Sequence, residues 1–281
     1  MLRELVSQLI QRFAQGGVTD VHFVPDEQMA RVICRTADGL KEQEAIPFSQ
    51  YSSIVSHIRY ESNLKEQNER IPQSGVYPVD QSGMRVSILP SRHGDAMSWR
   101  FYRAVVSSEI ASTLLNPIED LEWLQQQSHG CIIISGTTGA GKTTMLYSLM
   151  ASMEGKRIIS VEDPVECTVP GVLQLELNEK DGFAATRCFE EILRADPDWI
   201  AFGEVRTAEA ARLSINAALS GHVVVFTLHA GTVNEVLLRL KSLGISGEEL
   251  AVCKKIIHLY REEGHVHCTV ENLTRTANVA F

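Results

Sequence analysis

Nine residues near the middle of the chain, Gly136 to Thr144, read GTTGAGKTT and directly follow the apolar run Cys131 to Ser135. The β-branched run predicts a short buried strand, and the apolar spacing after the motif predicts a helix. Glycines in a turn between strand and helix allow backbone N–H groups to point inward around phosphates. The motif is a P-loop in its required setting, which argues against a chance glycine-rich turn. It predicts a nucleoside triphosphate site.

The expected phosphate contacts come from the loop and the first turn of the helix. Lys142 reaches the β and γ oxygens, and the Thr143 hydroxyl ligates Mg²⁺. The expected nucleotide contacts in this segment are Thr137, Thr138, Gly139, Ala140, Gly141, Lys142, Thr143 and Thr144. ATP and Mg²⁺ are therefore the expected cofactors.

The composition is that of a soluble globular protein. The 281 residues are 44% hydrophobic and 22% charged, and the length is sufficient for two cores. The formal net charge of −9 argues against a general surface for nucleic acids or anionic membranes, because these partners require a basic face. We therefore expect no direct binding of nucleic acid.

The cysteines and the N-terminal residues indicate where in the cell the protein is located. The chain has six cysteines and no C-x-x-C pair, which indicates reduced structural thiols and no zinc site. Its N-terminus mixes charged and apolar residues, unlike a signal peptide, and no run of about 18 apolar residues occurs. We expect a protein that stays inside the cell and has no transmembrane segment.

Residues 1–105 have the pattern of a small α+β domain. Leu2 to Phe13 place apolar residues on one helical face, and a Gly-Gly pair that follows ends that helix. Short strand-like runs lie at 21–24, 29–35 and 84–89, with a helix-period stretch at 51–60 among them. No internal repeat is visible.

Residues 106–281 alternate strands with helices, the pattern of an α/β domain with a parallel sheet. Four apolar strands each end on polar residues. They are 131–135, before the P-loop; 157–161, before Glu162 and Asp163; 199–202, before Gly203 and Glu204; and 223–227, before His229. Because the carboxyl ends of parallel strands meet at one edge, these polar residues are expected to converge on the phosphates.

Four motifs occur in a fixed order that resembles the secretion-NTPase superfamily of type II secretion and type IV pili. They are the P-loop, an Asp box at Val161 to Glu166, an atypical Walker B segment at Leu193 to Arg206, and a His box at Gly221 to His229. Segments 19–25, 70–75 and 85–90 are similar to the N-terminal domain of that family. The resemblance implies a RecA-like P-loop NTPase domain preceded by a PAS-like domain.

Within the superfamily, one branch is the most similar. The short length, the missing tetracysteine zinc insert, the run Val172 to Leu175 and the residues Asn178 to Lys180 most resemble the ATPases of DNA-uptake pseudopili. The resemblance therefore implies a machine that assembles a competence pseudopilus.

The resemblance also implies roles for the residues at the strand ends. Glu162 polarises the attacking water, Glu204 occupies the Walker B position, and Asp163 and Glu204 support Mg²⁺ partly through water. His229 senses the γ-phosphate, and His222 is a second nucleotide contact. Ordinary structural roles are the alternatives: a turn cap for Glu162, an N-cap acid for Glu204 and a structural histidine for His222.

Arginines complete the implied site. Arg85 and Arg100 match positions from which the family's first domain supplies arginine fingers, and Arg206 is a nucleotide contact beside the Walker B glutamate. Arg194 and Arg187 match further family arginines. The alternatives are surface arginines, packing, or contacts between subunits.

Some residues depart from the family pattern. Thr207 stands where relatives usually have Asp, and Glu190 where they usually have a basic residue. Gly203 replaces the usual Walker B Asp, and Gly231 to Val233 replace a common Thr-Asn-Asp. These departures predict slow catalysis or dependence on partners.

The implied function is a cytoplasmic motor ATPase, a homohexamer at the cytoplasmic face of the inner membrane. MgATP hydrolysis would swing the first domain against the second and act on an inner-membrane platform protein to assemble pilins for DNA uptake. One alternative is a nucleotide-gated scaffold with little turnover. A P-loop kinase or a DNA-translocating RecA relative is another, but it leaves the Asp and His boxes unexplained.

Overall fold

The computed structural model describes residues 2–15, 18–36, 39–65, 71–79, 82–101, 108–115, 120–177 and 185–273. The chain divides into two compact units, Met1–Arg103 and Ala104–Phe281. The predicted boundary between residues 105 and 106 falls in the segment 102–107, which lies outside the described residues. The same is true of Gly16 and Gly17, the predicted end of the first helix.

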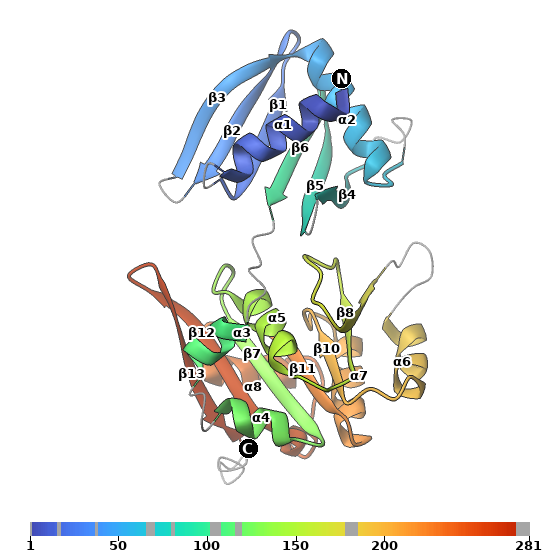
Figure 1. Ribbon diagram of the computed structural model, residues 1–281, viewed down its shortest axis with the longest axis vertical. Coiled ribbons are helices and arrows are strands. Elements are labelled where there is room, and N and C mark those ends of the chain that lie inside the picture. Colours follow the sequence, from blue (N-terminus) through green and yellow to red (C-terminus); the bar gives the residue numbers. More distant parts are fainter. Residues whose placement is uncertain are drawn as a thin grey trace. The chain divides into compact units, whose positions relative to one another are not determined.

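The first unit is a six-stranded antiparallel sheet with two helices (Figure 1). The strands lie in the order β3-β2-β1-β6-β5-β4, so the first and last strands in sequence pair at its centre. Its elements are α1 (Leu2–Gln15), β1 (Asp20–Pro25), β2 (Met29–Thr36), β3 (Gly39–Pro47), α2 (Phe48–Glu61), β4 (Gln73–Val79), β5 (Ser82–Ser91) and β6 (Gly94–Phe101).

Both helices of this unit pack on the same face of the sheet. Phe13 of α1 and Ile54 of α2 share one core with Trp99 of β6. Successive strand residues alternate between faces, so Arg85 and Arg100, the neighbours of core residues, project from the opposite face. The predicted arginine fingers therefore lie on the helix-free face of the first unit.

The helices and strands predicted here are confirmed as α1, α2, β1, β2 and β5. The strands β3, β4 and β6 were not predicted from their sequence pattern. In β3 the pattern was hidden because Lys41, Glu42 and Glu44 lie on an edge strand that is largely exposed. Because neither face of this edge strand is fully buried, its sequence does not alternate between apolar and polar residues and does not indicate a strand.

The second unit is a seven-stranded sheet with helices on both faces (Figure 1). Its elements are α3 (Ser108–Leu114), α4 (Glu122–Gln126), β7 (Gly130–Gly136), α5 (Lys142–Ser152), β8 (Ile158–Glu162), β9 (Val172–Glu176), α6 (Ala185–Arg194), β10 (Trp199–Phe202), α7 (Ala208–Leu219), β11 (Val223–His229), α8 (Val233–Ser242), the 3₁₀ helix η3 (Glu249–Val252), β12 (Cys253–Glu262) and β13 (His265–Asn272).

The strands lie in the order β13-β12-β7-β11-β10-β8-β9, and only the β12–β13 pair is antiparallel among the described neighbours. The interior strand β7 is buried along its whole length. Ile132 and Ile134 pack with α3, α4 and α5, whereas Cys131 and Ile133 pack with α6, α7 and α8. Burial on both faces explains the uninterrupted apolar run in the sequence.

The predicted α/β fold with a parallel sheet is confirmed, and the four predicted strands are β7, β8, β10 and β11. The strands β9, β12 and β13 were not predicted. The hairpin of β12 and β13 was not predicted because histidines and charged residues near its turn interrupt the apolar pattern that indicates a strand. Across the described ranges, no helix combines the length and the apolar character that crossing a bilayer requires.

Candidate nucleotide-binding site

The P-loop joins β7 to α5 and depends on glycine at two positions. A Cβ at Gly136 would lie 2.5 Å from the carbonyl oxygen of Leu259 on β12, so no larger residue fits. Gly141 has a φ of 100° and is the N-cap of α5. This left-handed conformation is one that glycine adopts without strain, and it brings the chain directly into the helix. The N-terminus of α5 thus faces the loop.

Lys142 is the first residue of α5. Its Nζ donates hydrogen bonds to the carbonyl oxygens of Gly136, at 3.0 Å, and Thr137, at 2.9 Å. Burial lowers the pKa of the ammonium group, the charge of Glu204 opposes that change, and the charge of Arg206 adds to it. The lysine is therefore held over the loop, among the charged side chains of the Walker B segment.

The hairpin of β12 and β13 braces the outer side of the P-loop. Arg261 Nε donates to the carbonyl oxygen of Gly139 at 2.8 Å, and a guanidinium nitrogen of the same residue donates to Gly264 at 3.1 Å. At the end of β7, the Ser135 hydroxyl is 2.9 Å from Nδ1 of the buried His258. Sequence reasoning missed Arg261 and His258 because their strand was not predicted.

Glu204 and Arg206 form an ion pair at the end of β10, with a nitrogen–oxygen distance of 2.7 Å. Burial alone would raise the pKa of the Glu204 carboxyl. The hydrogen bond and charge of Arg206, together with the charges of Lys142 and His229, outweigh burial and lower this pKa. Lys142, Glu204, Arg206 and His229 are thus near enough within the second unit for their charges to act on one another.

His229 ends β11 beside the start of the P-loop, since it pairs in register with Gly136, and it is exposed. Asp163 is also exposed, and its charge helps to raise the pKa of Arg206, after the hydrogen bond of Glu204. Both residues therefore lie at the carboxyl edge of the sheet, as the sequence predicted.

Glu162 has a different environment, because its side chain points into the protein and is only 3% exposed. The Tyr147 hydroxyl donates to Oε2, while Ser160 and Gln174 donate to Oε1 at 2.5 and 3.0 Å. A Cβ at Gly203 would lie only 3.2 Å from Cγ of Glu162, so the glycine makes room for this side chain. Glu162 thus lies at the end of β8, as predicted, and both of its carboxylate oxygens accept hydrogen bonds.

His222, which the sequence predicted as a nucleotide contact, does not lie at the P-loop of its own chain. His222 precedes β11, and its carbonyl oxygen accepts a bond from Gly130 at the start of β7. His229, at the other end of the strand, pairs with the start of the P-loop. Six or seven strand residues separate these ends by roughly 20 Å. The His222 ring instead lies 3.3 Å from the carbonyl oxygen of Ala217 in α7, a structural contact.

The arginines predicted in the first unit are placed within that unit alone. Arg100 Nε forms an ion pair with Asp20 at 2.7 Å, and its side chain is 61% exposed. Arg85 is half-buried and lies directly across from Arg100 in the pairing of β5 with β6. Arg194 of the second unit pairs with Glu190 and Glu191 on the exposed face of α6. The side chain of Arg187 lies outside the described residues.

Two departures from the family pattern have local structural roles. Thr207 is the N-cap of α7, and its side chain accepts a hydrogen bond from the Ala210 N–H at 3.2 Å. Glu190 contributes an exposed ion pair with Arg194, at 3.4 Å. Neither role requires the residue that the family usually has at that position.

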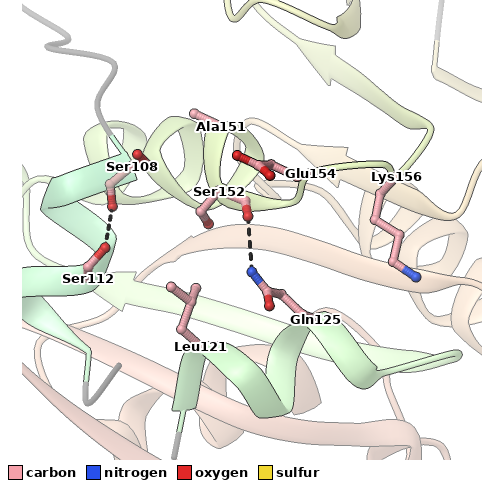
Figure 2. Close-up of a pocket in the computed structure, with 8 residues that line it drawn as sticks. All are labelled: Ser108, Ser112, Leu121, Gln125, Ala151, Ser152, Glu154 and Lys156. Carbon is pink, nitrogen blue, oxygen red and sulfur yellow. Dashed lines mark hydrogen bonds between the residues drawn. The ribbon is translucent and has the colours of Figure 1, made fainter. Parts of the chain in front are cut away.

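A surface cavity of about 490 Å³ lies at the other end of α5 (Figure 2). It is lined by Ser108, Ser112, Leu121, Gln125, Ala151, Ser152, Glu154 and Lys156. The eleven residues of α5, Lys142–Ser152, separate it from the P-loop by roughly 15 Å of helix. This cavity is therefore distinct from the predicted phosphate site.

The residues at the P-loop fit a nucleoside triphosphate and a divalent cation. Positive φ angles at Gly139 and Gly141 are compatible with inward N–H groups at the helix N-terminus, and a lysine begins the helix. Thr143 offers a hydroxyl. The described residues contain no cluster of three or more His, Cys, Asp or Glu that could hold a metal by themselves. Mg²⁺ fits here because it is held by few protein ligands, together with phosphate oxygens and water.

Several known proteins are similar to this chain. The family model described as "Type II/IV secretion system protein" matches residues 1–277. The type II secretion system protein HxcR of Pseudomonas aeruginosa is 31% identical over 86% of this chain and 53% of its own length. The competence protein ComGA of Bacillus subtilis is 30% identical over 99% of this chain and 84% of its own length.

The chain spans about half the length of several such relatives, 53%, 61% and 44% in three of them. The crystal structure of the pilus retraction motor PilT with bound ADP has the same fold, with a TM-score of 0.72 at 22% identity. That likeness covers 94% of this chain and 81% of the other. The match of the family model over nearly the whole chain shows that the protein belongs to the Type II/IV secretion system protein family.

Proposed function

We propose that this chain is the ATPase subunit of a motor that assembles a type IV pilus-like or type II secretion apparatus, a competence pseudopilus for DNA uptake. The second unit is a RecA-like P-loop ATPase in this proposal, and the first is PAS-like. The observation that carries the proposal is the convergence of Lys142, Glu204, Arg206 and His229 on one edge of the parallel sheet.

The reaction is transfer of the γ-phosphoryl group of ATP to water. A bond forms between the water oxygen and the γ-phosphorus, and the bond to the bridging oxygen breaks to give ADP and phosphate. Lys142 breaks its hydrogen bonds to the Gly136 and Thr137 carbonyl oxygens and bonds to the phosphate oxygens instead. Arg206 and His229 offset the negative charge that develops on the phosphate in the transition state. Thr143, Glu204 and Asp163 would hold Mg²⁺, which would supply further positive charge.

Two carboxylates are available to orient the attacking water. Glu204 lies among the cations, and Glu162 has the position that the family resemblance assigns to this task. In the conformation described here, Glu162 is bonded on both oxygens, so it must leave its network before it polarises a water. We assign water activation to Glu162 and metal support to Glu204.

Assembly and partners extend the proposal. Arg85 and Arg100 act as arginine fingers on the nucleotide, for which Arg100 exchanges its ion pair with Asp20. The working form is a homohexamer at the cytoplasmic face of the membrane, and its stroke acts on an inner-membrane platform protein. ComGA and PilT, named as a competence protein and a pilus motor, support the class of machine.

The test is phosphate release from MgATP beside binding of a fluorescent ATP analogue, with light scattering on the same samples. We expect Lys142→Ala to abolish binding. Glu204→Gln should bind the analogue and lose about a hundredfold or more in kcat. Lys156→Ala, at the remote cavity, is the matched lysine control and should behave as wild type. Normal turnover in Glu204→Gln would remove Glu204 from the mechanism.

A second candidate function is a nucleotide-gated scaffold or regulator of the same machinery. The buried, fully bonded carboxylate of Glu162 favours it, since a protein locked in this conformation would bind ATP without activating water. Analogue binding without phosphate release, in every oligomeric state observed, would favour the scaffold and refute a motor that hydrolyses ATP without its partners.

A further inference from the structure

We propose that Tyr147 is a positioning residue that holds Glu162 in a resting position, so that ATP turnover requires the bond between these two side chains to open. This inference rests on the proposed function, in which Glu162 activates the attacking water. It concerns a contact between α5, the helix that begins at the P-loop, and the strand end that carries the glutamate.

The hydroxyl of Tyr147 is fixed from two sides. It donates to Oε2 of Glu162 and accepts a hydrogen bond from the backbone N–H of Glu166 at 2.9 Å. The side chain has no exposed surface. Burial, followed by the charge of Glu162 and its hydrogen bond, raises the pKa of the phenol well above its usual range. Tyr147 therefore remains a neutral donor to the carboxylate at every physiological pH.

The other carboxylate oxygen is held by two further donors. Ser160, two residues earlier on β8, donates to Oε1 at 2.5 Å. The side-chain nitrogen of Gln174, on β9, donates to the same oxygen at 3.0 Å and to the Cys167 carbonyl at 3.0 Å. The amide oxygen of Gln174 accepts from the Val169 N–H at 2.7 Å. These bonds hold both the oxygen and the nitrogen of the Gln174 amide, so the amide nitrogen cannot move away from Glu162 without breaking the other bonds as well.

In this conformation the carboxylate of Glu162 is bonded to protein donors and is not directed toward solvent, so it is not placed to polarise an attacking water. Both oxygens accept hydrogen bonds from protein donors, and the residue is only 3% exposed. Of the three donors, only Tyr147 belongs to the helix that carries the P-loop lysine. Lys142 and Tyr147 are separated by about 7.5 Å along α5. A movement of α5 when phosphates bind at its N-terminus would therefore act directly on the Tyr147–Glu162 bond.

Steady-state kinetics of Tyr147→Phe test the inference. Removing the hydroxyl takes away one donor to Glu162 and leaves the ring volume in place. We expect the basal kcat to rise by about fivefold, the factor that one net hydrogen bond is worth, with KM for ATP unchanged. In a Glu162→Gln background the same substitution should have no effect, because the gated base is absent.

Ser148→Ala is the matched control. It also removes a buried hydroxyl from α5, but within the described part of the chain that hydroxyl bonds only to the Thr144 carbonyl of the same helix, at 2.7 Å. Its kcat should equal that of wild type. A kcat for Tyr147→Phe that is unchanged or reduced, in protein whose thermal unfolding matches that of Ser148→Ala, would overturn the inference while leaving the ATPase proposal intact.

A second measurement covers the case in which wild type hydrolyses no ATP and Tyr147→Phe misfolds. Hydrogen exchange of the wild-type protein is compared with and without a non-hydrolysable ATP analogue and Mg²⁺. Opening of the contact predicts faster exchange of the Glu166 amide, which loses its acceptor. Unchanged exchange at saturating analogue would refute the positioning role. Absence of turnover with faster exchange would instead refute the motor and retain the contact.

Discussion

Two glutamates that end neighbouring parallel strands lie in opposite environments. The side chain of Glu204 is one-third exposed and pairs with Arg206 near the charges of Lys142 and His229, whereas Glu162 is buried among neutral donors. Neutral donors that bond a carboxylate can hold it in place, and nearby cations keep one ionised. The difference in surroundings is the physical basis for assigning different tasks to two residues with the same side chain.

The environment of Glu204 predicts a dependence of stability on pH. Its pKa is lowered from 4.5 in the folded protein, so its contribution to stability is present above pH 4.5 and is lost as the pH falls through the lowered pKa. We expect wild type to exceed Glu204→Gln in the free energy of unfolding at pH 7, by less than about 1 kcal/mol because the group is partly exposed. The difference should shrink steadily below pH 4.5.

Urea unfolding of both proteins at pH 7 and at pH 4 measures this difference. Glu154→Gln, an exposed glutamate at the remote cavity, provides the same change of formal charge away from the P-loop cations. Equal differences at the two pH values would contradict the electrostatic account of the site.

The sequence was sufficient to predict the P-loop and the positions of Glu204, Asp163 and His229, because strand ends in a parallel sheet share an edge. It was insufficient for His222. The His box contains both His222 and His229, but these residues lie at opposite ends of strand β11. The buried orientation of Glu162 depends on Gln174, whose strand was not predicted. Contacts between elements distant in sequence leave no local pattern.

Among the helices, α7 and α8 begin with the same device. Thr207 and Thr232 are their N-caps, and each accepts a hydrogen bond from a backbone N–H three residues later, both at 3.2 Å. In α8, Glu235 also accepts from the Gly231 N–H at 2.7 Å. The departures at Thr207 and at Gly231 to Val233 therefore retain helix starts directly after β10 and β11, the strands that supply Glu204 and His229.

The cap at Thr207 leads to a prediction about α7. Thr207→Ala should lower the free energy of unfolding by about 1 kcal/mol, the usual value of an N-cap side chain. Thr207→Asp introduces the residue common in the family and should be nearly neutral, because an aspartate accepts the same hydrogen bond and favours the helix N-terminus. Chemical denaturation of the three proteins measures both effects. A loss in Thr207→Asp as large as in Thr207→Ala would mean that the threonine has a role beyond capping.

On the scale of the whole molecule, each unit has a hydrophobic core formed from its own residues. The core with Phe13, Ile54 and Trp99 lies entirely in Met1–Arg103, and the two cores on either face of the second sheet lie entirely in Ala104–Phe281. The α/β character of the second unit was predictable because its central strands are buried on both faces. The sheet order of the first unit was not, since three of its strands lacked a clear pattern.

Separate cores predict that the first unit folds independently. Residues 1–103, expressed alone, should unfold in one cooperative thermal transition and give a dispersed amide NMR spectrum, since a domain of this size with its own core is commonly stable. Phe23→Ala, which removes a buried ring from that core, should abolish the transition or lower its midpoint sharply. A non-cooperative, collapsed wild-type fragment would show that the unit requires the rest of the chain.

The placement of the tryptophans gives the two units different optical signals. Trp99 belongs to the first unit, whereas Trp123 and Trp199 belong to the second. The indole N–H groups of Trp99 and Trp199 are buried without a hydrogen-bond partner among the described residues, so both rings lie in apolar surroundings. Apolar surroundings shift indole emission to shorter wavelengths. Replacing Trp99 by Phe would leave a fluorescence signal from the second unit alone, through which the unfolding of that unit can be followed inside the intact chain.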